Sequence, residues 1–153
     1  MLEAKEKYSN QVITTSRLGY EVNSFAQSVN ISQIVIFTQD KIKKDMSWAD
    51  NFSNHVVVLN DSEKAKDISS ALDSINYLAQ IKADRNTLLI AYGGGSVSDH
   101  VGFVASIFKR GIKYINIPTT LVGMIDASIG GKTAINIDTL KNQIGTFYQP
   151  SKI

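Results

Sequence analysis

The stretch Thr87-Leu-Leu-Ile-Ala-Tyr-Gly-Gly-Gly-Ser-Val-Ser-Asp99 decides the fold class of this 153-residue chain. Its first six residues form an apolar run with little polar alternation, which suits a strand that is buried on both faces, as in a parallel sheet. After three glycines, Asp99 to Arg110 carries apolar residues at helical spacing, and the pattern stops at Gly111. A strand, a glycine turn and a helix in this order are typical of a layered α/β domain.

The segments on either side repeat this pattern. Three further apolar runs predict strands at Gln33 to Thr38, His55 to Asn60 and Lys113 to Pro118, and Glu63 to Lys82 has the apolar spacing of a helix. We also expect Gln11 to Arg17 to begin a strand pair before the main sheet. The alternation predicts a layered parallel-sheet, Rossmann-like α/β domain that occupies residues 1–153.

Composition sets limits on the function. The chain is 43% apolar and 20% charged, as in ordinary globular proteins, and its net charge of +2 gives no support for a nucleic-acid or membrane partner. No apolar run reaches about 20 residues, and the first ten residues are too polar for a signal peptide. We therefore expect a soluble, cytoplasmic protein. With no cysteine and two histidines, the sequence predicts no metal site.

The glycine loop from Gly93 to Asp99 is placed where ligands bind, beyond the carboxyl end of a predicted strand. Glycines let a backbone approach a ligand closely, and the start of a helix offers N–H groups and a partial positive charge to a pyrophosphate. As a dinucleotide fingerprint the loop is incomplete, because Ser98 stands where a third glycine is usual. The alternative is a tight turn with Ser98 or Asp99 as helix N-cap. The loop alone leaves both interpretations open.

Two other loops carry polar groups suited to anions. The adjacent Thr119 and Thr120 can donate to phosphate oxygens, or Thr120 can cap a helix from Leu121 to Ser128. Gly131-Lys132-Thr133 matches the end of a Walker A loop, but the position of that motif's first glycine is Asp126. Because a carboxylate there would repel a nucleoside triphosphate, we do not interpret this loop as an ATP site.

Three longer segments, "GGGSVSDHVGF", "FKRGIKYINIPTTLVGMIDASIGGKTAIN" and "LKNQIGTFYQP", resemble the 3-dehydroquinate synthase family of the shikimate pathway, in order and in spacing. The resemblance covers about Asp61 to Pro150. It implies a homodimeric lyase of aromatic amino-acid biosynthesis that holds NAD tightly. In that family 3-deoxy-D-arabino-heptulosonate 7-phosphate is oxidised, loses phosphate, is reduced again and closes by an aldol step to 3-dehydroquinate.

The resemblance also implies roles for individual residues. Glu63 and Lys66 match a ribose-contacting pair, Asp99 matches the ribose-binding acid, and Thr119 and Thr120 match threonines beside the pyrophosphate. The implied dinucleotide loop consists of Gly94, Gly95, Ser96, Val97 and Ser98. The implied substrate-orienting and catalytic set consists of Asp126, Lys132, Asn142 and Arg110, with Lys132 and Lys141 as further cofactor contacts and Arg110 reaching a neighbouring subunit's phosphate site.

Each of these residues alone also fits a plain structural role. Lys132 and Lys141 fit solvated surface lysines, Asp126 and Asn142 fit turns, and Arg110 fits the C-terminal end of a helix. It is the ordered set of motifs that favours a site. We assign His55 to the start of a strand and His100 to a helix, with no metal-binding role.

The sequence also departs from the family pattern. Ser98 and Leu140 replace common glycines, and His100 replaces a small or apolar residue. The chain stops at Ile153, where the family's second, helical domain begins. That domain carries the glutamate and two histidines that bind a divalent zinc or cobalt ion. We therefore expect the N-terminal NAD-binding half of the enzyme, inactive by itself.

Three alternatives remain open. A metal-dependent polyol (glycerol-type) dehydrogenase shares the pattern G-G-G-S-x-x-D, but the segment that follows Thr120 resembles the cyclase instead. Another sugar-phosphate cyclase would differ mainly in the second domain. A non-catalytic nucleotide-binding module would bind NAD without turnover.

Overall fold

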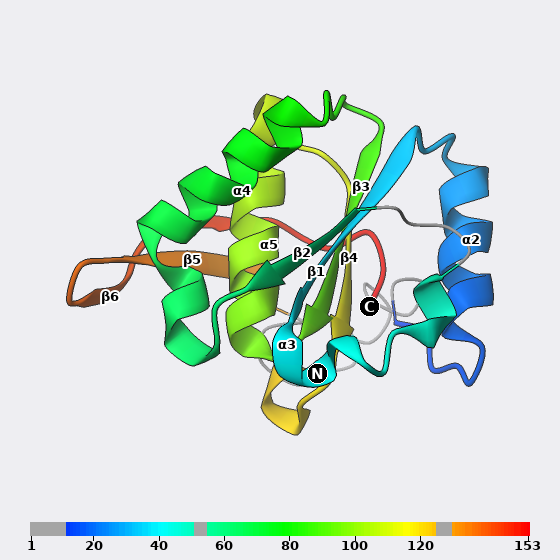
Figure 1. Ribbon diagram of the computed structural model, residues 1–153, viewed down its shortest axis with the longest axis horizontal. Helices are drawn as coiled ribbons and strands as arrows, with labels where there is room; N and C mark the ends of the chain where they lie inside the picture. The colour runs from blue at the N-terminus through cyan, green and yellow to red at the C-terminus, as the bar shows by residue number, and fades with distance from the viewer. Residues whose placement is uncertain (1–11, 51–54, 125–129) are drawn as a thin grey trace.

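The computed structural model describes residues 12–50, 55–124 and 130–153, and its centre is a four-stranded parallel sheet (Figure 1). The strand order is β2-β1-β3-β4, and each neighbouring pair is parallel. The strands are β1 (Gln33–Gln39), β2 (His55–Leu59), β3 (Thr87–Gly93) and β4 (Tyr114–Pro118). The predicted α/β fold class and all four predicted strands are confirmed, with ends that differ by at most one residue.

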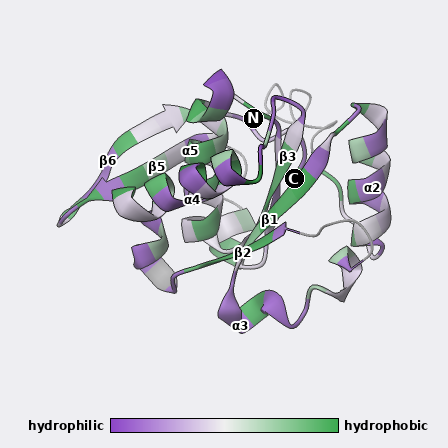
Figure 2. Ribbon diagram, turned by 45° about the horizontal axis from the view of Figure 1, so that its top comes forward, coloured by the Kyte–Doolittle hydropathy of each residue, from purple (hydrophilic) through white to green (hydrophobic). Residues whose placement is uncertain are grey.

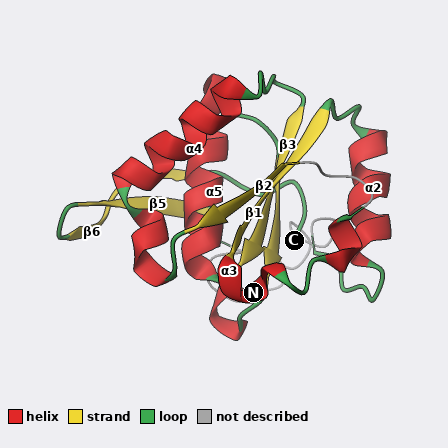
Figure 3. Ribbon diagram, in the orientation of Figure 1, coloured by secondary structure: helices red, strands yellow, loops and turns green. Residues whose placement is uncertain are grey.

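Helices cover both faces of the sheet (Figure 3). One face packs against α4 (Ile68–Gln80) and α5 (Gly95–Ile107), and the other packs against α2 (Leu18–Ser28) and the short η1 (Ser47–Ala49). Side chains of β1 alternate between the two cores, with Phe37 in the first and Ile36 in the second. This two-sided burial explains why the strands read as continuous apolar runs, which appear as the green strands of Figure 2.

The helix expected from Glu63 to Lys82 is interrupted. Its first residues form the 3-10 turn η2 (Ser62–Lys66), Asp67 is extended with φ −67° and ψ 144°, and only then does α4 begin at Ile68. The physical reason is that the Asp67 backbone pairs with Asn136, which a continuous helix would prevent. Because of this break, η2 can run in a different direction from α4. The polar side chains of η2 therefore lie toward α5.

The helix α5 begins four residues before the expected Asp99. Gly94 is its N-cap residue, and the Gly94 carbonyl accepts from the N–H groups of Val97 and Ser98. The interpretation of Ser98 or Asp99 as N-cap is therefore wrong. Gly95 and Ser96 form the first turn, where the N–H groups have no intrahelical partner.

A β-hairpin that the sequence analysis did not predict follows the sheet. It consists of β5 (Lys132–Ile137) and β6 (Leu140–Phe147), which pair antiparallel and lie across α5. Thr133 Oγ1 lies 3.0 Å from the Thr146 carbonyl, and Thr146 Oγ1 donates to Ser106 Oγ of α5 at 2.9 Å. Gly102 of α5 allows the close approach, because a Cβ there would overlap Thr133 Cγ2.

The expected strand pair at Gln11 to Arg17 is wrong for the described residues 12–17, which form no strand. The Arg17 N–H donates to Thr15 Oγ1 at 2.9 Å, and this bond forms a local turn that leads into α2. Instead, the end of the chain lies beside β4, where the Asn116 N–H donates to the Lys152 carbonyl at 3.0 Å. The Ile13 N–H in turn donates to the Ile153 carbonyl at 2.8 Å.

Three further elements complete the described chain: α3 (Asp40–Lys43), η3 (Phe108–Arg110) and a single helical turn at residues 121–124. Within the described ranges, none of the helices combines the length and the apolar character that crossing a bilayer requires.

His100 joins α5 to η2 and α4 in the core. Its side chain is fully buried, with Nδ1 2.6 Å from the Ala65 carbonyl and Nε2 2.8 Å from Ser74 Oγ. Because a carbonyl only accepts, Nδ1 carries the proton and Nε2 accepts from the serine. The structural assignments of His100 to a helix and of His55 to the start of a strand are confirmed. Burial lowers the pKa of His100 to about 4, although the hydrogen bond to Ala65 opposes this shift.

This pKa predicts a loss of stability in mild acid. Between pH 6.5 and about 4 the unfolded chain binds a proton on this imidazole that the folded chain does not, so folding loses roughly 3 kcal/mol across that window. We expect His100→Gln to remove this part of the pH dependence. The measurement is urea unfolding of both proteins at intervals from pH 7.5 to 4. Equal losses of unfolding free energy in the two proteins would contradict the assignment.

Candidate functional site

An open pocket of about 430 Å³ lies where η2, the start of α5, the turn after β4 and the hairpin meet. This is the position expected for a ligand beyond the carboxyl ends of parallel strands. The pocket is lined by Glu63, Lys66, Gly95, Ser96, Asp99, Val122, Lys132, Ala134 and Asn142. All but Val122 and Ala134 are predicted site residues, which the fold brings together from three separate segments of the chain.

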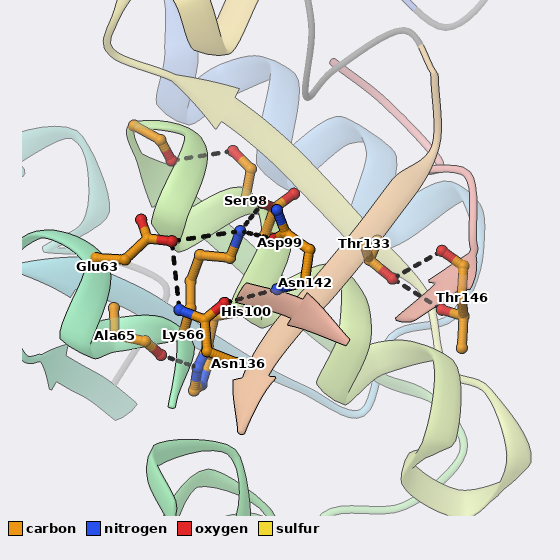
Figure 4. Close-up of polar contacts among 11 residues, drawn as sticks. Glu63, Ala65, Lys66, Ser98, Asp99, His100, Thr133, Asn136, Asn142 and Thr146 are labelled. Carbon is orange, nitrogen blue, oxygen red and sulfur yellow. Dashed lines mark hydrogen bonds and ion pairs between the residues drawn. The ribbon is translucent and has the colours of Figure 1, made fainter. Parts of the chain in front are cut away.

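Lys66 is the centre of a charged network in this pocket (Figure 4). The residue is only 5% exposed, and its ammonium Nζ lies 2.7 Å from Asp99 Oδ2, 2.6 Å from Asn142 Oδ1 and 3.9 Å from Glu63 Oε1. A buried ammonium is costly unless it is paired and hydrogen-bonded, and these partners meet that need. Their remaining oxygen lone pairs give the pocket acceptors for hydroxyl groups of a ligand.

The glycine loop opens into the same pocket. A Cβ on Gly95 would meet no atom within 4 Å, whereas a Cβ on Gly94 would lie 3.2 Å from Thr120 Cγ2. The backbone of the first turn of α5 is therefore accessible at Gly95, and the helix adds a partial positive charge there. A phosphate or pyrophosphate is the type of group that such a helix start binds.

The side chains of Val97 and Ser98 point away from the pocket. Val97 lies in the core, and Ser98 Oγ is 2.7 Å from Asn116 Oδ1 beneath the loop. The serine that replaces a family glycine is thus accommodated by a polar partner on β4. A role for these two residues in cofactor binding stays a prediction.

The two threonines after β4 support the loop. The Thr119 N–H donates to the Gly93 carbonyl at 2.9 Å, and Thr120 Oγ1 accepts from the Gly123 N–H at 3.1 Å. Thr120 therefore caps the helical turn at residues 121–124, and the rest of the helix expected up to Ser128 lies outside the described residues. Asp126 lies outside them too, so its predicted role stays a prediction.

The predicted basic residues fall in different places. Lys132 is exposed at the start of β5 and lines the pocket, whereas Lys141 is exposed on β6 and does not line it. Arg110 follows the opposite end of α5 from Asp99, beyond a stretch of helix from Asp99 to Ile107 that spans about 12 Å at 1.5 Å per residue. Arg110 therefore does not reach this pocket within one chain. Its expected role at a neighbouring subunit's site stays a prediction.

Asn136 is a member of the network that the sequence analysis missed. It is 4% exposed, its Nδ2 donates to Glu63 Oε1 at 3.3 Å, and its Oδ1 accepts from the Asn142 N–H at 2.9 Å. The one sequence signal is a polar residue that follows the apolar pair Ala134 and Ile135.

Among the described residues there is no group of three or more histidine, cysteine, aspartate or glutamate side chains that could hold a metal ion. On the opposite face of the sheet, an apolar pocket of about 420 Å³ lies between α2, β4 and the end of the chain. It is lined mainly by aliphatic side chains and by Phe25, and its polar members are Thr14, Thr15, Glu21 and Lys152.

Comparison with known proteins gives consistent matches. Residues 56–153 match the family model described as 3-dehydroquinate synthase N-terminal. A curated 3-dehydroquinate synthase from Sulfurisphaera tokodaii is 44% identical over 136 residues, which are 89% of this chain and 39% of that protein. This chain spans about two fifths or less of the length of the first curated relatives that it matches.

Solved structures match the fold over nearly the whole chain. A 2-epi-5-epi-valiolone synthase from Streptomyces hygroscopicus subsp. jinggangensis 5008, solved with NAD+ and Zn2+, is 28% identical with a TM-score of 0.78. The match covers 92% of this chain and 41% of that one. A 2-deoxy-scyllo-inosose synthase, solved with carbaglucose-6-phosphate, NAD+ and Co2+, has a TM-score of 0.81 at 22% identity over 91% of this chain and 40% of that one. At that identity it shows the fold alone.

Proposed function

Because the chain belongs to the 3-dehydroquinate synthase N-terminal family, we propose that its pocket between η2, α5 and the hairpin binds NAD. In this proposal the chain is the cofactor-binding half of a cytoplasmic enzyme. That enzyme converts 3-deoxy-D-arabino-heptulosonate 7-phosphate to 3-dehydroquinate and phosphate. The match at 44% identity supports this substrate over those of other sugar-phosphate cyclases and of polyol dehydrogenases.

The observation that carries the proposal is the joint presence of two half-sites in one pocket. The accessible backbone at Gly95, at the start of α5, suits the pyrophosphate of a dinucleotide. The carboxylates of Asp99 and Glu63 line the same pocket and suit ribose hydroxyls. A simple phosphate ligand would not use the carboxylates as hydrogen-bond acceptors. A sugar alone would not use the N–H groups at the start of α5.

The residues present fit NAD and would divide its recognition between them. Asp99 and Glu63 would accept from ribose hydroxyls, while Lys66 keeps the two carboxylates from repelling each other. The exposed ammonium of Lys132 would attract the anionic substrate to the edge of the pocket. NAD supplies the hydride acceptor for the oxidation and the hydride donor for the later reduction.

The metal and the rest of the chemistry need groups beyond the described residues. The described part holds no cluster suited to zinc or cobalt, so we assign no step to a metal here. We propose that those ligands come from the part of the longer relatives that this chain does not span. We propose also that the enzyme is a homodimer in which Arg110, remote from the pocket of its own chain, serves the partner.

The direct test is calorimetric titration of this chain with NAD, comparing it with Gly95→Val. A Cβ at Gly95 meets no atom of the protein within 4 Å, so the side chain of a valine there starts in open space at the pocket. We expect saturable binding to the unchanged chain and at least a tenfold weaker affinity in the variant.

Gln80→Val, on the exposed end of α4, is the matched control and should bind NAD as the unchanged chain does. The proposal is overturned if the unchanged chain gives no binding at millimolar NAD. It is also overturned if Gly95→Val binds as tightly as the control.

A further inference from the structure

The buried amide of Asn136 holds together two of the three groups that surround Lys66 (Figure 4). Its Nδ2 donates to Glu63 of η2, and its Oδ1 accepts from the backbone of Asn142 on β6. Asn136 does not line the pocket itself. Any effect of this residue on a ligand must therefore pass through its neighbours.

The orientation of the amide is fixed by chemistry. The Glu63 carboxylate at neutral pH can only accept, and the Asn142 N–H can only donate, so the amide nitrogen faces the first and the oxygen faces the second. An aspartate in the same place would keep the acceptor and lose the donor. A leucine would lose both. The site thus requires the two ends of one amide, and a merely polar side chain would not be enough.

The bond to Asn142 matters because that residue has an unusual backbone. The pairing of β5 with β6 is irregular between Ile135 and Ile137, and Asn142 has a left-handed φ of 53°. Asparagine adopts this region more readily than other residues except glycine, and neighbouring contacts hold it there. The side-chain oxygen Oδ1 of Asn136 accepts from the Asn142 N–H. This bond orients Asn142 so that its own Oδ1 lies 2.6 Å from Lys66 Nζ.

The backbone of Asn136 adds a third link, since it pairs with Asp67 at the junction between η2 and α4. Asn136 therefore connects the hairpin to the turn that carries Glu63 and Lys66. We propose that Asn136 is a positioning residue that sets the geometry of the Glu63–Lys66–Asn142 cluster and so the affinity for the ribose part of NAD. This inference rests on the proposed function for its ligand only; the geometry of the cluster is tested without one.

The test compares the chain with Asn136→Asp and with the double variant Asn136→Asp/Glu63→Gln. The single change places two carboxylates face to face and should weaken NAD binding about tenfold. In the double variant the side chain at position 63 becomes the donor, and the side chain at position 136 becomes the acceptor, of the hydrogen bond between them. We expect it to bind NAD more tightly than Asn136→Asp, an improvement that a purely structural role for Asn136 would not produce.

A second readout needs no ligand. We expect the Lys66 ammonium to give a slowly exchanging proton signal in NMR spectra of the free chain, because three oxygens surround it, and Asn136→Asp to broaden or abolish that signal. An unchanged ammonium signal in Asn136→Asp overturns the inference even if NAD binds. If the signal changes and the unchanged chain does not bind NAD, the proposed function fails while the role of Asn136 in the cluster stands. NAD binding that is equal in Asn136→Asp and the unchanged chain also overturns the inference.

Discussion

Replacing Asp99 with alanine is expected to lower the free energy of unfolding by about 3 kcal/mol, because it leaves the buried Lys66 ammonium without its closest anion. The Lys66 side chain is 6% exposed, so water from the pocket replaces the carboxylate 2.7 Å away only in part. Asn142 and Glu63 remain nearby, but an amide oxygen and a carboxylate at 3.9 Å compensate only partly. Urea unfolding at pH 7 measures the change.

The double variant Lys66→Met/Asp99→Ala identifies the cause. With the ammonium removed as well, no orphan charge is buried, and we expect the double variant to be more stable than Asp99→Ala alone. Asp73→Ala, at an exposed position on α4, is the control for loss of a carboxylate and should change stability by less than about 0.5 kcal/mol. A double variant that is no more stable than the single one would contradict the buried-pair account.

Replacing Gly102 with alanine is the second change with a large expected effect. The new methyl group would overlap Thr133 Cγ2 and lie 3.1 Å from the Tyr114 hydroxyl, so β5 must move away from α5. Overpacking of this kind costs about 1–3 kcal/mol, and here we expect the upper end because a strand rather than one side chain has to shift. Since the hairpin brings Lys132 and Asn142 to the pocket, the affinity for NAD should fall as well.

Thr133→Ser tests this explanation directly. It removes the methyl group that Gly102→Ala would strike and keeps the hydroxyl that bonds to Thr146. We expect the double variant Gly102→Ala/Thr133→Ser to recover at least half of the lost unfolding free energy. Gly95→Ala is the matched control, because its Cβ meets nothing within 4 Å and should leave stability unchanged. A Gly102→Ala protein as stable as this control would show that the hairpin does not depend on the close approach.

The sequence predicted the sheet well because its strands are buried on both faces. A run such as Thr87 to Tyr92 is mostly apolar, so its composition alone indicates burial on both faces, without knowledge of the strands beside it. The hairpin was missed because β6 is largely exposed and contains a left-handed residue at Asn142, so it lacks a clear period of two. Helix starts were also misplaced. At η2 and at Gly94 they depend on backbone pairing and on a glycine N-cap, which apolar spacing does not reveal.

The candidate site could be predicted as a set of residues but not as a network. The ordered motifs indicated Lys66, Asp99 and Asn142, yet nothing local shows that residues separated by 33 and 76 positions share one ammonium. Asn136 belongs to no predicted set, because its importance comes from the two neighbours that its amide joins. For Arg110 the motif indicated a residue that serves a neighbouring subunit's site, and the fold places it at the far end of α5, where that role stays a prediction.

The measurement that tests the central claim most directly is an NMR titration of the isotope-labelled chain with NAD, following the backbone amides. The account predicts the largest shifts at Gly94, Gly95, Ser96 and Asp99 and in the segment that carries Asn142. Residues around the apolar pocket beside Phe25, on the other face of the sheet, should shift little. Shifts concentrated around Phe25, or spread without preference while the glycine loop stays still, would contradict the assignment of the dinucleotide site to the start of α5.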